Sequence, residues 1–249
     1  MIESDILDQF STDQARLLQQ MRENPPPHTK WPEGCYGSLL AWLTFVGPSP
    51  GGGHINSPEV PRDLQAETPF WNTDYNNPCE LWSKGFRVST KIIVETILGR
   101  DRSQGALKLY NYTNFDWIQN PNAVNVPKER MHRGVNIVLS HLREVGPRVV
   151  VSMGAKAHKI LTDILEKEYK LRQPQFSSVR ILCPRGYHRA MDAYEIMDNG
   201  PLKGTIIVRS PQHPARIFSA DYAYRCAQAI RKTILCIATN NEPIDILEL

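Results

Sequence analysis

The stretch R-V-V-V-S-M-G-A-K-A, residues 148–157, joins a run of β-branched residues to a helix through a Gly-Ala turn. A short β-branched run that ends in turn residues is typical of a central parallel strand covered on both faces. Apolar residues then recur at helical spacing, at Ala157, Ile160, Leu161, Ile164 and Leu165. A second apolar stripe, Val135 to Val145, precedes the strand and is stopped by Gly146-Pro147. This helix–strand–helix unit predicts a parallel α/β sheet with helices on both faces.

Similar patterns on either side of this unit predict the remaining elements. Short apolar runs predict strands at Ser38–Val46, Leu107–Tyr112, Val179–Cys183 and Thr205–Arg209. Helical spacing predicts helices at Ser11–Glu23, Val88–Leu98 and Ala220–Ile237. We therefore expect a three-layer αβα sandwich around a central, mainly parallel four-stranded sheet. Residues 1–249 are expected to form one domain, with a helical N-terminal extension over 1–36 and an insertion over 166–204.

Composition narrows the class of protein. The hydrophobic fraction of 41% and charged fraction of 22% are those of a globular chain. The five cysteines contain no C-x-x-C pair, which argues against a zinc knuckle or a disulfide framework and favours reduced thiols in the cytoplasm. The N-terminus is acidic without an apolar h-region, and no apolar run is long enough for a membrane span. A net charge of +3 permits nucleic-acid binding but does not demand it.

Three predicted strands end in unusual polar or glycine-rich turns, at Gly47–His54, Thr113–Trp117 and Ser210–Arg216. Ligands of open α/β sheets bind outside the carboxyl ends of the strands, so we expect these turns to face one crevice. The glycine loop is followed by neither Gly-Lys-Ser/Thr nor an immediate helix, which excludes a P-loop and a dinucleotide fingerprint. A rigid loop with free N–H groups lets a flat ligand approach closely. Taken singly, the loop is equally a plain turn, Asn114 a turn cap and His213 a structural histidine.

Five short motifs occur in order between Trp42 and Arg216. They are Gly47–Gly51 (G-P-S-P-G), Thr68-Pro69-Phe70, Thr113-Asn114, Val149–Ala157 and His213-Pro214. As an ordered set they resemble the motifs of the uracil-DNA glycosylase superfamily, and residues 149–157 resemble its thermostable, bacterial-type branches. The resemblance implies that family's fold and a monomeric, monofunctional DNA glycosylase. Such an enzyme flips a pyrimidine out of DNA and hydrolyses its N-glycosidic bond, because that bond is unreachable inside the stacked duplex.

The resemblance also implies roles for individual residues. Asn114 would hydrogen-bond the Watson–Crick edge of the flipped base, Phe70 would stack on it, and His213 would stabilise the charge leaving with the base. The loop would hold the base and its 3′ phosphate through Gly47, Pro48, Gly51, Gly52 and Gly53. His54, Lys156 and Arg216 would contact DNA, and phosphate contacts of this kind position the strand without reading its sequence.

Two departures from the family pattern bear on chemistry and substrate. Family members commonly place Asp, Asn or Glu at the second or third position of the first motif, where this chain has Pro48 and Ser49. Neither Pro48 nor Ser49 can act as a general base unaided, so Ser49 would need help from a carboxylate, Asp74 or Asp116, or from His54. A surface location is the alternative for each carboxylate, and a solvated loop position is the alternative for His54. Gly51 stands where the strict uracil enzymes place a Tyr that walls off the pyrimidine C5 position. We therefore expect tolerance of C5-substituted bases, such as glucosylated hydroxymethylcytosine in anti-phage defence.

Other readings of the sequence stay open. The chain is alternatively a uracil-excision repair enzyme, a non-catalytic nucleic-acid binding module that retains the fold, or a hydrolase of free nucleosides. The basic residues of segment 166–204, Arg185 and Arg189 among them, form either a solvated face or a basic lip that embraces the duplex. One branch of the superfamily carries a four-cysteine iron–sulfur cluster, but the cysteines here are not clustered. We expect no cofactor and no metal.

Overall fold

The computed structural model describes residues 36–37, 41–48, 84–99, 110–115, 126–173, 180–182, 186, 188–217 and 219–239. The elements in chain order are β1 (Tyr36–Gly37), β2 (Leu43–Gly47), α3 (Lys84–Leu98), β3 (Tyr110–Asn114), α4 (Lys128–Arg133), α5 (Val135–Val145), β4 (Val149–Ser152), α6 (Ala155–Glu168), β5 (Leu171–Arg172), β6 (Arg180–Leu182), β7 (His188–Ala190), β8 (Ala193–Ile196), β9 (Ile206–Arg209), the 3-10 helix η5 (Pro214–Arg216) and α7 (Ala220–Thr239). The helix expected at Ser11–Glu23, and the N-terminal extension up to residue 35, lie outside the described residues.

The described strands form one mixed sheet in the order β1-β3-β2-β4-β9-β8-β5. The four central strands, β3, β2, β4 and β9, run parallel. The strands β1 and β8 are antiparallel to their neighbours β3 and β9, and β5 is antiparallel to β8. The expected α/β class is therefore confirmed, but the four-stranded sheet is wrong. The parallel strands are only the centre of a wider, mixed sheet.

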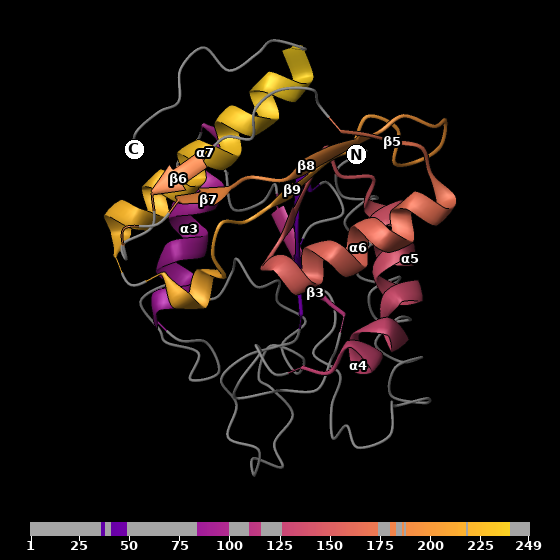
Figure 1. The fold of residues 1–249 in the computed structure, drawn as a ribbon, viewed down its shortest axis with the longest axis horizontal. Coiled ribbons are helices and arrows are strands. Elements are labelled where there is room, and N and C mark those ends of the chain that lie inside the picture. Colours follow the sequence, from indigo (N-terminus) through magenta and orange to yellow (C-terminus); the bar gives the residue numbers. More distant parts are fainter. Residues whose placement is uncertain are drawn as a thin grey trace, which may run out of the picture.

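Helices cover both faces of the sheet, which gives the expected three layers. The helices α3 and α7 pack together on one face, and α4, α5 and α6 lie on the other (Figure 1). The strand β4 contributes to both cores: Val149 and Val151 face the α3–α7 layer, whereas Val150 faces the α5–α6 layer. All three valines are buried, as the continuous β-branched run predicts for a central strand.

The segment 166–204, expected as an insertion, supplies the antiparallel side of the sheet through β5 and β8. The strand predicted at Val179–Cys183 exists as β6, but it pairs only with β7, in a separate two-stranded sheet beside α7. The strand β8 was not predicted, because only its first and last residues, Ala193 and Ile196, are buried and the pattern between them is polar. No helix in the described part of the chain has the length and hydropathy needed to cross a bilayer.

Candidate functional site

The topology of the sheet marks one place for a ligand. From β2 the chain crosses to β3 on one side and then returns to β4 on the other side, so β2 and β4 flank a topological switch point. In open α/β sheets ligands bind at such a point, outside the carboxyl ends of the strands. The residues there are Gly47 and buried Pro48 at the end of β2, and Met153 and Gly154 after β4.

Gly47 and Asn114 lie side by side at this edge, as register partners at the last positions of β2 and β3. Asn114 is fully buried, and its Oδ1 accepts a 2.7 Å hydrogen bond from the Tyr112 hydroxyl. A Cβ on Gly47 would lie 2.5 Å from that Oδ1, 2.6 Å from the Tyr112 hydroxyl and 3.0 Å from Met153 Cε. Glycine is therefore the residue that fits here, and Tyr112 fixes the orientation of the Asn114 amide.

The backbone just beyond Asn114 is held closely from two sides. The Phe115 N–H donates a 3.0 Å hydrogen bond to the Gly47 carbonyl oxygen, which continues the β2–β3 pairing past Asn114. At the junction of α4 and α5, a Cβ on Gly134 would lie 1.6 Å from the Phe115 carbonyl oxygen. The α4–α5 junction therefore packs directly on the backbone that carries Asn114, and only glycine permits this approach.

His213 follows β9 on the loop that leads into η5. The Ser210 N–H donates to the Ser152 carbonyl oxygen (2.9 Å), and the Arg216 N–H donates to the His213 carbonyl oxygen (2.8 Å). Burial of the ring and, secondarily, the positive charge of Arg216 lower the pKa of His213 to about 4. The imidazole is therefore neutral at pH 7, and its N–H is a hydrogen-bond donor without a formal charge. Since β9 is two strands away from β2, its end lies about 10 Å from the end of β2.

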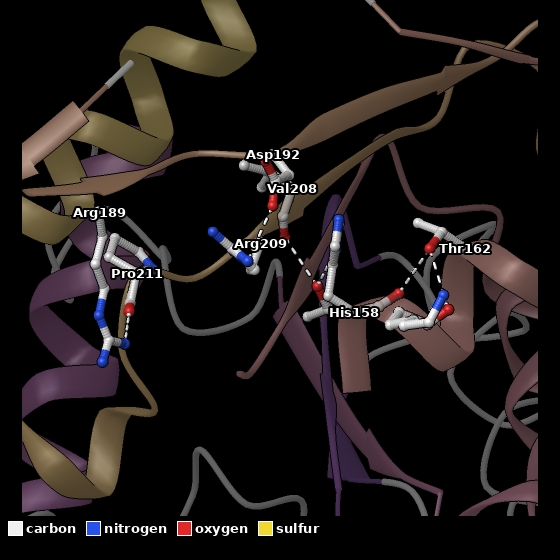
Figure 2. Close-up of polar contacts among 9 residues, drawn as sticks. His158, Thr162, Arg189, Asp192, Val208, Arg209 and Pro211 are labelled. Atoms are coloured by element: carbon white, nitrogen blue, oxygen red, sulfur yellow. Dashed lines mark hydrogen bonds and ion pairs between the residues drawn. The ribbon is translucent and has the colours of Figure 1, made fainter. Parts of the chain in front are cut away.

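The β6–β7 hairpin is tied to the loop that carries His213. The Arg189 Nη1 donates a 2.6 Å hydrogen bond to the Pro211 carbonyl oxygen, two residues before His213 (Figure 2). In the same segment Arg172 forms an ion pair with Glu195 across β5 and β8. The guanidinium of Arg189 therefore stabilises the loop of His213. This favours a structural role for Arg189 over the alternative that it belongs to a basic lip around the DNA duplex. Arg185 lies outside the described residues.

A buried polar group lies at the carboxyl end of β4, on the α6 face. Ser152 Oγ and His158 Nδ1 are 2.6 Å apart, and Ser152 Oγ also donates to the Val208 carbonyl oxygen at 3.3 Å. Beside them Arg209 forms a 2.9 Å ion pair with Asp192 (Figure 2). Burial and, secondarily, the charge of Arg209 lower the pKa of His158 to about 4. Because Ser152 and His158 are almost fully buried, this pair joins α6 to β4 and β9 and is not exposed to a substrate.

The structure places several predicted site residues at the carboxyl edge of the sheet. Gly47, Pro48, Asn114 and His213 all follow or end parallel strands there, and Arg216 is exposed on η5. Lys156 begins α6 at the same edge, but its Nζ donates a 2.7 Å hydrogen bond to the Val126 carbonyl oxygen inside the protein. The other predicted site residues lie outside the described residues: Ser49, Gly51, Gly52, Gly53, His54, Phe70, Asp74 and Asp116.

Three features of the site were not predicted from the sequence. The first is the contact between Tyr112 and Asn114. Side chains two residues apart on a strand point to the same face, so the alternation along Y-N-Y-T-N could have indicated this contact. Gly134 interrupts an otherwise helical pattern, which is a recognised sign of close packing. The contact between Ser152 and His158 had no local signal, since it depends on how α6 folds back along β4.

No protein-family model matches the chain, and a search of curated proteins finds no match.

Proposed function

We propose that the chain is a monofunctional DNA glycosylase, which binds a pyrimidine extruded from DNA and hydrolyses its N-glycosidic bond to leave an abasic site. One observation carries the proposal: a buried asparagine amide, oriented by Tyr112, adjoins an obligatory glycine at the switch point of the sheet. A side-chain amide offers N–H donors and a carbonyl acceptor together, so it can complement the donors and acceptors along the Watson–Crick edge of a pyrimidine. Because Gly47 has no Cβ, the Asn114 amide, the Tyr112 hydroxyl and Met153 can pack against the end of β2.

The low pKa of His213 supports a role in leaving-group stabilisation. Glycosidic cleavage passes through an oxocarbenium-like transition state in which negative charge develops on the departing base. A neutral imidazole N–H aimed at the base oxygen O2 would stabilise that charge, and a single preorganised donor of this kind contributes about 3–4 kcal/mol. The fixed loop around His213 meets the need for preorganisation, because its backbone is bonded to Ser152 and to Arg189.

We further propose that the substrate is a pyrimidine with a C5 substituent, such as glucosylated hydroxymethylcytosine in phage DNA. This proposal rests on the sequence alone, on Gly51 at the position of the family's C5-blocking tyrosine. The water-activating carboxylate is proposed to be Asp74 or Asp116, with Ser49 assisting and not acting as a base by itself. Plain uracil is the alternative substrate.

Single-turnover release of free base tests the proposal. Duplex and single-stranded oligonucleotides carrying uracil, hydroxymethyluracil or glucosylated hydroxymethylcytosine would be incubated with excess protein, and the released base identified by mass spectrometry. Asn114→Ala and His213→Ala are expected to slow release, the latter by about 10²- to 10³-fold. Asn136→Ala and His188→Ala are matched controls, because both residues are exposed and lie on α5 and β7. They should leave the rate unchanged.

Each contrary result would support a different function. If no base is released from any oligonucleotide but DNA binding is retained, the protein is a non-catalytic binding module and not a glycosylase. Release from free nucleosides but not from oligonucleotides would make the protein a nucleoside hydrolase. Release of uracil alone would contradict the proposal of a C5-substituted substrate but support the proposed glycosylase activity.

A further inference from the structure

A short basic helix, α4, lies at the same edge of the sheet as the candidate site. Its sequence, K-E-R-M-H-R, contains three arginine or lysine residues and one acidic residue. Met131 is fully buried and anchors the helix, whereas Lys128, His132 and Arg133 are exposed. We refer to Lys128, His132 and Arg133 as the α4 surface.

Two contacts fix where the α4 surface lies. Gly134, directly after the helix, packs on the carbonyl oxygen of Phe115, the residue that follows Asn114. At the other end, Lys156 at the start of α6 donates to the carbonyl oxygen of Val126, two residues before the helix. The helix therefore spans the rim between the end of β3 and the start of α6, at the lower end of α5 in Figure 1.

In the part of the chain that the structure describes, neither cation of the α4 surface, Lys128 or Arg133, forms an ion pair, and Glu129 is the one acidic residue on the helix. On the adjoining helices Arg143 pairs with Glu168, and Lys159 pairs with Asp163 at 3.1 Å. Neither Lys128 nor Arg133 has a described carboxylate within ion-pair distance. Two exposed cations that form no ion pair, with one acid beside them, are free to bind the phosphates of a polyanion.

We propose that the α4 surface binds the phosphate backbone of nucleic acid next to the candidate base site. The identification of the polyanion as DNA rests on the proposed function. Lys128 and Arg133 would each neutralise a phosphate and release its condensed counterion, while the base enters beside Asn114. Such contacts set the position of the strand and carry no sequence preference. Lys156, which was expected to contact phosphate, instead supports this helix through its bond to the Val126 carbonyl oxygen.

The salt dependence of DNA binding tests the proposal. The affinity for a fluorescent duplex of unmodified bases would be measured by anisotropy between about 50 and 200 mM salt. Loss of two phosphate contacts in the double variant Lys128→Ala/Arg133→Ala should reduce the slope of log K against log salt by about 1.8, or 0.9 per contact. The matched control is Lys167→Ala/Lys170→Ala, which removes two exposed lysines, one in the last turn of α6, about 18 Å from its start, and one just after the helix. Its slope should equal that of the unchanged protein.

The outcomes separate this inference from the glycosylase activity, because the probe contains no base to excise. A reduced slope in the α4 variant but not in the control supports the α4 surface even where no base is released. Equal slopes for the α4 variant and the unchanged protein, with the circular dichroism spectrum retained, would overturn it. Binding to vesicles rich in anionic lipid that depends on Lys128 and Arg133, with DNA binding unaffected, would also overturn it in favour of a membrane surface.

Discussion

Gly47→Ala tests the central contact of the site. The new methyl group would lie 2.5 Å from Asn114 Oδ1 and 2.6 Å from the Tyr112 hydroxyl, where ordinary contact begins at about 3.4 Å. All three residues are buried, Gly47 and Asn114 at the ends of paired strands and Tyr112 in the middle of β3, so the methyl group cannot turn to solvent. Either the Tyr112–Asn114 hydrogen bond breaks or the two strand ends move apart.

The expected cost is the sum of two effects. Overpacking of a well-packed interior costs about 1–3 kcal/mol, and loss of one buried hydrogen bond costs about 1 kcal/mol. Gly47→Ala should therefore lower the free energy of unfolding by about 2–4 kcal/mol, which corresponds to a fall of about 1 M in the urea midpoint. Urea unfolding followed by circular dichroism measures this shift directly. The rate of base release should fall by more than the loss of folded protein alone explains, because the Asn114 amide would no longer be held in its orientation.

A double-mutant cycle with Tyr112→Phe tests the geometry itself. Tyr112→Phe removes one of the two oxygens that the methyl group would meet. The penalty of Gly47→Ala should therefore be smaller by about 0.5–1 kcal/mol in the Tyr112→Phe background, since residues in contact are not additive. Additive effects, or a Gly47→Ala variant as stable as the unchanged protein, would refute the described packing of Gly47 against Tyr112 and Asn114.

Two further predictions follow from buried and bridging side chains. The pKa values of His141, His158 and His213 are lowered to about 4, chiefly by burial, so between pH 4 and 6.5 the unfolded chain, with pKa values near 6.5, binds more protons than the folded chain. The free energy of unfolding should therefore be highest above about pH 6.5 and fall as the pH drops towards 4, by at most about 3 kcal/mol for each histidine. Urea midpoints at pH 7 and pH 5 measure this fall, and His158→Gln should make it smaller. The same fall in His158→Gln as in the unchanged protein would contradict the burial of His158. Arg189→Met removes the hydrogen bond to the Pro211 carbonyl oxygen, so base release should slow while the salt slope of DNA binding stays unchanged. Arg189→Lys should restore part of the rate. A reduced salt slope in Arg189→Met would instead indicate that Arg189 contacts DNA phosphate.

The sequence predicted the centre of this fold better than its edges. The strand β4 and the helices α5 and α6 were predictable, because a strand buried on both faces and a helix with one apolar stripe each leave a clear periodic pattern. The strand β8 lies towards the edge and is half polar, so its pattern was lost. The strand β6 was recognised as a strand, but its pairing with β7, apart from the main sheet, is a long-range choice that no local pattern records.

The same distinction applies to the candidate site. Asn114 and His213 were predicted as site residues from short motifs, and both lie at the carboxyl edge of the sheet, although Asn114 was expected in a turn and is the last residue of β3. The contacts that hold them were not recognised: Gly134 against Phe115 and Arg189 against Pro211 join segments about twenty residues apart through packing alone. Motif residues can therefore be read from the chain, whereas the residues that support them depend on the assembled sheet.

The position of β9 in the sheet has a consequence for biosynthesis. This strand, Ile206–Arg209, inserts between β4 and β8, both of which precede it in the chain. A nascent chain that has not yet reached Ile206 therefore presents two open strand edges, each a template for pairing with another chain. A chain that ended before Ile206 would keep both edges open, so it would be prone to aggregate before it could bind any ligand.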